Sequence, residues 1–100
     1  MRGARFLGDR KLEVTDFPDV EPESNEVLLK VRASGMCGSD LHAYRSPAAE
    51  INTTNRPGHE PCGEVVALGL GANKAKIGDR AMIHHYVGCG NCRFCREGYQ

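Results

Sequence analysis

The sequence predicts a mainly β domain with one or two short helical turns. Twelve glycines and five prolines punctuate the 100 residues, and short apolar segments with strand-like alternation lie between them. The chain shows neither a long amphipathic helix nor an internal repeat. Its length makes one domain at most.

The first two strands are expected at residues 2–7 and 11–17. Gly8-Asp9-Arg10 lies between them and is typical of a hairpin turn. The segment that follows, 16–26, is acidic and carries two prolines, so we expect it to be a solvated surface loop.

The clearest strand is residues 26–33. Its alternation places four apolar side chains on one face and charged ones on the other; the apolar set is Val27, Leu29, Val31 and Ala33. Residues 34–38 interrupt this strand. Ser39 follows as a candidate N-cap for a helical turn over 40–45.

The second half of the chain alternates loops with strands. We expect a loop at 46–57, a strand at 63–70, a turn-containing loop at 69–78 and a third strand at 81–86. The remaining segment, 87–100, is rich in glycine and cysteine and lacks the periodicity of a core element.

Charge and hydropathy exclude several classes of protein. Thirteen Lys and Arg balance 13 Asp and Glu, so the basic surface of a nucleic-acid-binding protein is missing. No apolar stretch approaches the ~20 residues that span a bilayer, and no apolar segment follows Arg2 and Arg5 as in a secretory signal. Five cysteines, an odd number, argue against a secreted disulfide framework and indicate a reducing, cytoplasmic setting.

Three cysteines lie close together near the end of the chain: Cys89, Cys92 and Cys95. This C-x-x-C-x-x-C spacing supplies three of the four ligands of a tetrahedral zinc site. An iron–sulfur run begins the same way, but it continues to a fourth cysteine followed by proline, which Arg96-Glu97-Gly98 does not provide. A redox pair normally opens a helix in a βαβ unit, and the glycine-rich flanks oppose that interpretation.

A second set of metal-binding residue types lies at predicted strand ends. Cys37 follows the strand 26–33, and His59 and Glu60 precede the strand that begins at 63. Each residue alone has an ordinary structural role: a hydrogen-bonded histidine, or a small buried thiol. Together they offer the three protein ligands of a catalytic zinc, or two of them acting with a later residue.

Four segments in order then resemble the zinc-dependent medium-chain alcohol dehydrogenase family: GMCGSDLH at 35–42, GHEPCGEVVALG at 58–69, GDRA at 78–81 and CGNCRFCREG at 89–98. The resemblance extends over the whole chain. It implies a GroES-like fold, which is a partly open β-barrel with a small cysteine-rich zinc lobe.

The resemblance also implies roles for single residues. Cys37 and His59 match the catalytic zinc ligands, and Glu60 matches a direct, alternate or water-mediated ligand. Ser39 matches the hydroxyl that contacts the substrate oxygen, and His42 matches the outer member of a proton relay that runs through the cofactor ribose. Asp40 matches the carboxylate that orients the zinc-bound imidazole, while Cys89, Cys92 and Cys95 match ligands of the structural zinc.

Some parts of the family pattern are missing from these residues. The fourth lobe cysteine, the last catalytic zinc ligand and the Rossmann domain would all follow residue 100. Gly69-Leu70-Gly71 begins like a phosphate-binding loop but lacks the third glycine, so we interpret it as a turn. Residues 1–100 are therefore expected to be the N-terminal part of a catalytic domain, with an incomplete lobe at 87–100.

The function that follows is alcohol or polyol oxidation with zinc and with NAD or NADP, the latter bound by a domain outside this chain. The expected partners are a small-molecule alcohol and further copies of the complete chain, with neither nucleic acid nor membrane. The alternative is a stand-alone zinc-binding β module without catalytic activity.

Other residues are given structural roles. His84 and His85 are adjacent on a predicted strand, so they point to opposite faces. One of them could be a ligand, but we expect one to be in the core and the other on the surface. Cys62 is expected to be a packed thiol. Asp79 and Arg80 are expected to form a local ion pair.

Overall fold

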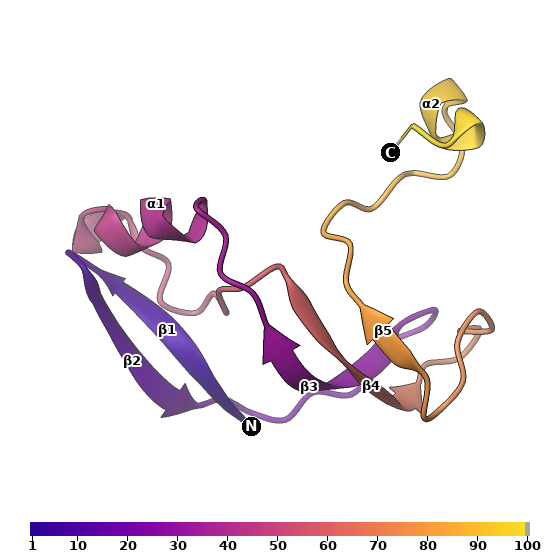
Figure 1. Cartoon of the computed structure of the whole chain (residues 1–100), viewed down its shortest axis with the longest axis horizontal. Coiled ribbons are helices and arrows are strands. Elements are labelled where there is room, and N and C mark those ends of the chain that lie inside the picture. Colours follow the sequence, from indigo (N-terminus) through magenta and orange to yellow (C-terminus); the bar gives the residue numbers. More distant parts are fainter. Residues whose placement is uncertain (100) are drawn as a thin grey trace.

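The computed structural model describes residues 1–99, which form two small antiparallel β-sheets and a few short helices (Figure 1). One sheet is the hairpin of β1 (Arg2–Gly8) and β2 (Lys11–Asp16). The other has the order β3-β4-β5, built from β3 (Val27–Ser34), β4 (Pro61–Leu68) and β5 (Arg80–Met82). The predicted mainly β class is confirmed, and these sheets do not close into a barrel.

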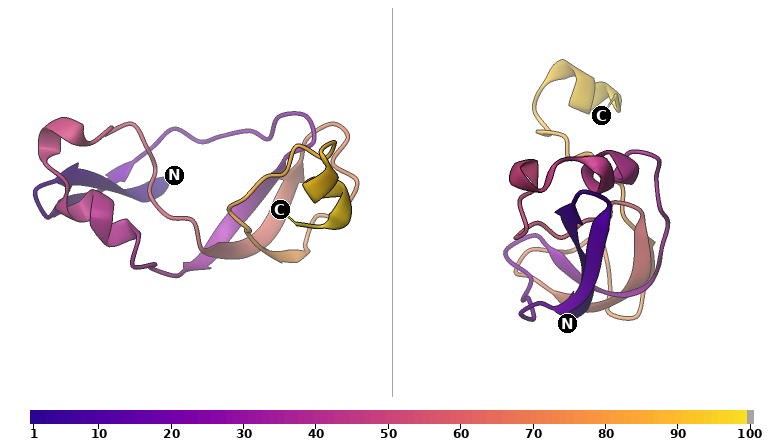
Figure 2. Two further views of the ribbon diagram at one scale, coloured as in Figure 1. Left: turned by 90° about the horizontal axis from the view of Figure 1, so that it is seen from above. Right: turned by 90° about the vertical axis from the view of Figure 1, so that its left-hand side faces the viewer.

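The helices lie at two ends of the molecule. α1 (Asp40–Arg45) and the 3-10 turn Ala48–Glu50 lie beside the β1–β2 hairpin, whereas α2 (Arg93–Glu97) stands apart from both sheets at the end of an extended segment (Figures 1 and 2). None of the helices formed by residues 1–99 has the length and apolarity needed to cross a membrane.

The turn of the β1–β2 hairpin holds α1 in place. Gly8, Asp9 and Arg10 all have positive φ, at 77°, 50° and 60°. This tight turn directs two backbone N–H groups outward: that of Asp9 donates to the carbonyl of Ser46 and that of Arg10 to the carbonyl of Tyr44, both at 2.8 Å. The carboxyl end of α1 is therefore fixed by backbone hydrogen bonds to the predicted hairpin turn.

The three-stranded sheet departs from the simple alternation expected of its first strand. Pairing of β3 with β4 shifts register between Leu28 and Leu29, and again between Val31 and Ala33. Each shift changes which face of the sheet the following side chains occupy. Val31, expected to face inward, is 57% exposed, while Val65 of β4 is fully buried.

Three further expectations need correction. The strand expected at 81–86 ends at Met82: the backbone N–H of Ile83 still donates to the carbonyl of Pro61 at 3.0 Å, but proline has no N–H to donate in return. The loop at 46–57 contains the 3-10 turn Ala48–Glu50. Ser39 has helical backbone angles and makes no capping hydrogen bond with its side chain; the carboxylate of Asp40 instead accepts from the backbone N–H of Cys37 at 2.9 Å.

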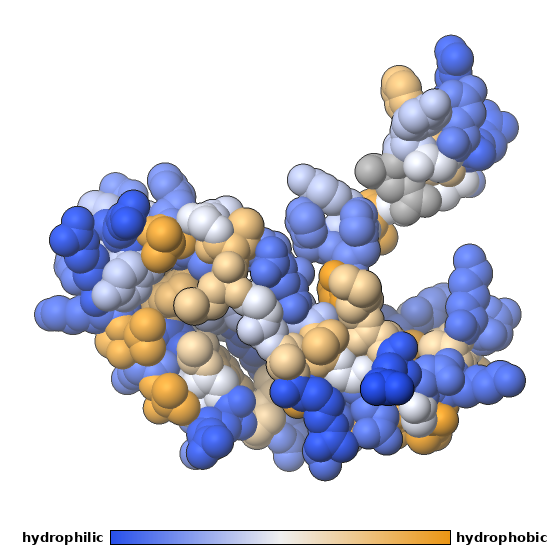
Figure 3. Space-filling model, viewed as in Figure 1, coloured by the Kyte–Doolittle hydropathy of each residue, from blue (hydrophilic) through white to orange (hydrophobic). Residues whose placement is uncertain are grey.

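The buried core is small. Phe17 and Val65 are the buried apolar side chains among residues 1–99, and many large apolar side chains remain exposed across the visible face (Figure 3). The ring of Phe17 lies under two guanidinium groups, with Cζ of Arg5 at 5.2 Å and Cζ of Arg56 at 5.4 Å from its centroid. These cation–π contacts join the β1–β2 hairpin to the loop that precedes β4.

Replacement of Gly8 tests the contact between the hairpin turn and the segment after α1. A Cβ at this position would lie 2.6 Å from Cα of Ala48, and φ is +77°. We expect Gly8→Ala to lower the free energy of unfolding by about 1–3 kcal/mol, measured by urea denaturation. Gly38→Ala is the matched control, because a Cβ there meets no atom within 4 Å. Equal stability of the two variants would contradict this account.

Candidate metal centres and the adjoining cavity

Strand pairing brings the first candidate metal cluster together. Ser34 at the end of β3 pairs with Pro61 at the start of β4, and the backbone N–H of Gly35 donates to the carbonyl of Glu60 at 3.2 Å. The segment after β3 and the segment before β4 therefore meet at one end of the sheet. The ligand atoms of Cys37, His59 and Glu60 all lie within 4.8 Å of one another as a result.

Asp40 ties two members of this cluster to each other. Its Oδ2 accepts from the backbone N–H of Cys37 at 2.9 Å, and its Oδ1 lies 3.4 Å from Nδ1 of His59. A carboxylate beside Nδ1 fixes the orientation of the imidazole, and the other ring nitrogen, Nε2, is left to bind a metal. Metal-bound histidines in proteins commonly have such a partner.

The electrostatics of the cluster favour a thiolate. Hydrogen bonding from Ser39, and then from His59, lowers the pKa of Cys37 below its usual value. The pKa of His59 is raised, chiefly by its hydrogen bond with Cys37 and further by the charges of Asp40 and Glu60. Both shifts favour the charged forms of the pair, a thiolate at Cys37 and an imidazolium at His59. A metal would displace the imidazolium proton, because it binds thiolate and neutral imidazole.

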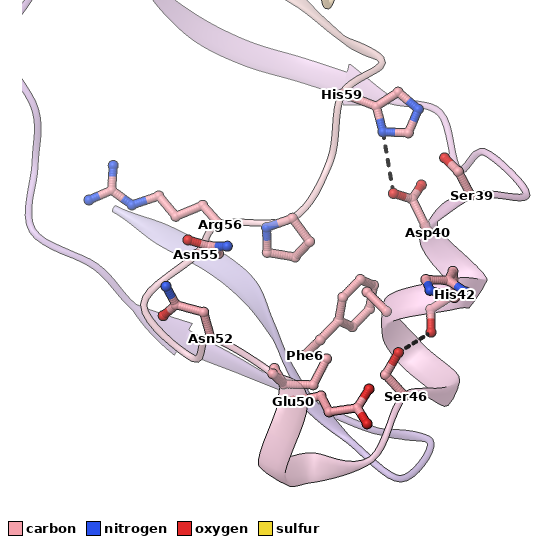
Figure 4. A pocket seen from close by; sticks show the side chains of 13 residues that line it. Phe6, Ser39, Asp40, His42, Ser46, Glu50, Asn52, Asn55, Arg56 and His59 are labelled. Atoms are coloured by element: carbon pink, nitrogen blue, oxygen red, sulfur yellow. Dashed lines mark hydrogen bonds and ion pairs between the residues drawn. The ribbon is translucent and has the colours of Figure 1, made fainter.

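A cavity of about 720 Å³ adjoins the cluster (Figure 4). Ser39, Asp40 and His59 line it on the side of the cluster, and His42 of α1 lines it further along. The structure thus brings Ser39 and His42, two residues singled out in the sequence, to one hollow beside the possible metal ligands. A volume of this size suits a small-molecule ligand.

His85, which the sequence analysis assigned to a structural pair with His84, is a further neighbour of the cluster. Its ring lies 5.3 Å from that of His59 in an edge-on arrangement. His84 and His85 follow the end of β5, and both are exposed, so the expected division between core and surface is wrong. The pairing of β5 with the start of β4 brings the two histidines close to the first cluster. In the sequence, the adjacent histidines after a short strand were the feature that could have indicated this position.

Two smaller expectations also fail. Cys62 is exposed rather than packed. The carboxylate of Asp79 accepts from the backbone N–H of Lys76 at 2.9 Å, and within residues 1–99 it forms no ion pair with Arg80.

The second candidate cluster is local and lies in the segment that holds α2. The Sγ atoms of Cys89, Cys92 and Cys95 also lie within 4.8 Å of one another. Cys92 is the N-cap of α2, and its Sγ accepts from the backbone N–H of Cys95 at 3.5 Å. Gly90 and Gly98, with φ of 74° and 81°, allow the chain to turn on either side. The sequence analysis had not predicted this short helix.

Backbone donors stabilise a thiolate in the second cluster as well. Hydrogen bonds from the N–H groups of Cys92 and Asn91, followed by the neighbouring thiols, lower the pKa of Cys89 to about 7. The guanidinium of Arg93 pairs with Glu97 at 2.9 Å. Thiolate is the form of cysteine that binds zinc.

The donor sets of both clusters fit zinc. Thiolate and imidazole are ligands that zinc prefers, and three protein ligands leave a fourth tetrahedral position. Beside the first cluster lies the cavity that Ser39 and His59 line. In the second, the described residues of the cluster offer three thiols and no fourth ligand.

Comparison with known families matches residues 23–100 to the alcohol dehydrogenase GroES-like domain. Among curated proteins, the chain is 37% identical to the uncharacterised zinc-type alcohol dehydrogenase-like protein YphC of Escherichia coli, over 99% of the chain and 30% of that protein. It is 37% identical to sorbitol dehydrogenase of Bacillus subtilis, over 98% and 29%, and 40% identical to L-threonine 3-dehydrogenase of Klebsiella pneumoniae, over 95% and 29%. The chain spans less than a third of the length of these relatives.

Solved structures give the same match. An alcohol dehydrogenase of E. coli, crystallised with the cofactor NADH, superposes with a TM-score of 0.80 at 31% sequence identity, over 99% of this chain and 28% of that one. The GroES-like arrangement of the strands is therefore confirmed by structure as well as by sequence.

Asp40 provides a test of the first cluster. We expect Asp40→Asn to weaken zinc binding about 10–100-fold, because the imidazole of His59 loses the carboxylate that orients it. Chelator competition would measure this in a Cys92→Ser background, which removes the second cluster from the titration. Asp9→Asn is the control: it neutralises an exposed carboxylate at the hairpin turn, where asparagine tolerates the positive φ. Unchanged affinity in Asp40→Asn would exclude the orienting role.

Thiol alkylation provides a test of the second cluster. In zinc-free protein, the rate of modification of Cys89 by iodoacetamide should rise with pH through a midpoint near 7, since its pKa is about 7 and the thiolate is the nucleophile. Added zinc should suppress the reaction at Cys89 and leave exposed Cys62 reactive. Peptide mass spectrometry separates the two sites. Equal protection of both thiols would argue against a site at Cys89.

Proposed function

Because the chain belongs to the alcohol dehydrogenase GroES-like domain family, we propose that it is the N-terminal catalytic part of a zinc-dependent alcohol or polyol dehydrogenase. The reaction is oxidation of an alcohol to a carbonyl compound with hydride transfer to NAD or NADP. The observation that carries the proposal is the convergence of Cys37, His59 and Glu60 beside a cavity lined by Ser39 and His42.

We propose the domain assignment on the basis of the same family membership. Residues 1–100 form the N-terminal part of the GroES-like catalytic domain, with the beginning of a structural zinc lobe at 87–100. The nucleotide-binding domain belongs to a part of the protein outside this chain. The relatives, more than three times as long as the region matched here, support this division.

The first cluster is the catalytic zinc site in this proposal. Cys37 and His59 hold the ion, and Glu60 serves as a direct, alternate or water-mediated ligand. A bound zinc supplies Lewis-acid polarisation of the alcohol oxygen, which lowers the energy of losing its proton. Asp40 keeps the imidazole of His59 in place through the 3.4 Å contact with Nδ1.

Ser39 and His42 carry the hydroxyl proton of the alcohol substrate away from the first cluster. The Oγ atom of Ser39 accepts the hydrogen bond of the substrate hydroxyl and passes a proton outward. The imidazole of His42, which would also help to hold the ribose of a bound cofactor, receives the proton and releases it to solvent. Both residues line the cavity, and His42 is exposed, as release to water requires.

The second cluster has a structural role in this proposal. Cys89, Cys92 and Cys95 hold a zinc that organises the turn around α2. A structural zinc site is closed by four ligands, of which these three thiols are part, and it contributes to folding rather than to chemistry. Figure 1 shows α2 apart from the β1–β2 hairpin and from α1, which supports this division of roles.

We also propose the setting of the complete enzyme. It acts in the cytoplasm on a small-molecule alcohol, assembles as a homo-oligomer and binds neither nucleic acid nor membrane. The five free cysteines suit a reducing compartment, and the balanced charge offers no basic surface for nucleic acid.

Cys37→Ala in the full-length protein tests the function. We expect loss of the catalytic zinc and a fall in kcat/KM of at least about 100-fold in an alcohol panel with NAD and NADP. Cys62→Ala, which removes an exposed thiol outside both clusters, should retain zinc and turnover. Full activity of Cys37→Ala would exclude the assignment. A wild-type protein that binds zinc yet oxidises no alcohol would favour the stand-alone zinc-binding module.

A further inference from the structure

We propose that Gly35 is a positioning residue for the first cluster: the space left by its missing side chain holds the carboxylate of Glu60 among the metal ligands. The inference rests on the proposed dehydrogenase function, in which Cys37, His59 and Glu60 form the catalytic zinc site. It assigns a task to a residue that lies two positions before Cys37 and has no ligand atom of its own.

The side chain of Glu60 occupies the place where a side chain of residue 35 would begin. A Cβ atom added to Gly35 would overlap Oε2 of Glu60, and it would lie 3.3 Å from both Cβ and Cδ of that side chain. Cβ atoms in folded proteins essentially never lie closer than 3.0 Å to such neighbours. Any residue other than glycine at position 35 would therefore displace the carboxylate of Glu60.

The backbone of Gly35 is not free to move away from Glu60. Its N–H group donates to the carbonyl of Glu60 at 3.2 Å, directly beyond the pair that Ser34 forms with Pro61. An added methyl group would thus be held against the carboxylate by the same hydrogen bond that aligns the two segments. The carboxylate is the part that would shift, because the last torsion of a glutamate side chain turns easily. Such a shift costs little stability.

The displacement matters because the ligand atoms of the first cluster all lie within 4.8 Å of one another. Asp40 positions the other two ligands: it accepts from the backbone N–H of Cys37 at 2.9 Å and lies 3.4 Å from Nδ1 of His59. Within residues 1–99, Glu60 forms no ion pair that could hold its carboxylate in the same way. Its placement therefore depends on the fit against Gly35.

Gly38 offers a matched comparison in the same loop. It follows Cys37 directly, and a Cβ atom added there would meet no atom within 4 Å. Neither Gly35 nor Gly38 has a positive φ, so alanine brings no backbone strain at either position. Gly35→Ala and Gly38→Ala make the same chemical change on the two sides of Cys37, and the first alone reaches Glu60.

The test measures Co²⁺ binding by the full-length protein in a Cys92→Ser background, which removes the second cluster from the titration. Chelator competition gives the affinity, and the visible absorption spectrum of the bound Co²⁺ reports the geometry of its ligands. We expect Gly35→Ala to weaken binding about 10–100-fold and to change the spectrum, whereas Gly38→Ala should match the parent protein in both. Urea denaturation of the metal-free proteins should give the same midpoint for the two variants, which separates a misplaced ligand from a damaged fold.

A double-mutant cycle shows whether Gly35 acts through Glu60. Glu60→Ala should weaken Co²⁺ binding, and Gly35→Ala added to it should cause no more than about a twofold further loss, because the carboxylate is already absent. An equal loss with and without the Glu60 carboxylate, or an unchanged affinity and spectrum in Gly35→Ala, would overturn the positioning role. Either result would leave the zinc site at Cys37 and His59 standing. A parent protein with Cys92→Ser that binds neither Co²⁺ nor Zn²⁺ would overturn the proposed catalytic site and this inference with it.

Discussion

The arrangement of this molecule depends on the antiparallel pairing of β3 with β4. Nothing in local sequence joins Cys37 to His59, which are separated by a helix, a 3-10 turn and a loop. Their meeting follows from the pairing of Ser34 with Pro61 and from the hydrogen bond between Gly35 and Glu60 just beyond it. Cys37 follows β3, and His59 and Glu60 directly precede β4, so the hydrogen bonds between the two strands set the separation of these ligands. Asp40 then orients them.

The hairpin β1–β2 supplies the second fixed point. Its turn donates to the carbonyls of Tyr44 and Ser46, and Phe17 beside it lies under the guanidinium groups of Arg5 and Arg56. The hairpin thus contacts both walls of the cavity, the one carried by α1 and the one carried by the loop before β4. With so few side chains fully buried, such hydrogen bonds and cation–π contacts carry much of the positioning that a larger core would otherwise provide.

Local signals were predictable from the sequence, and long-range geometry was not. The positive-φ turn at Gly8, the strand around Val65 and the spacing of Cys89 and Cys92 are written in neighbouring residues, and the structure contains all three features. The register shifts between β3 and β4, the early end of β5 and the approach of His85 to His59 depend on which residue pairs with which. The register of a strand is set by all the strands of its sheet, so it cannot be predicted from the sequence of one strand.

The two candidate metal clusters both contain thiols, but the chain builds them in different ways. This difference in construction separates their roles. Cys89, Cys92 and Cys95 lie on one short segment whose own backbone N–H groups donate to the sulfur atoms. A metal there would order its own surroundings. Cys37, His59 and Glu60 come from two segments held in place by a sheet, with Asp40 already paired to His59 and with a cavity alongside. A metal there would find its ligands positioned in advance and would lie next to a space for a ligand. Preorganisation beside a cavity is what a chemical step requires, whereas a self-contained loop is sufficient for stability.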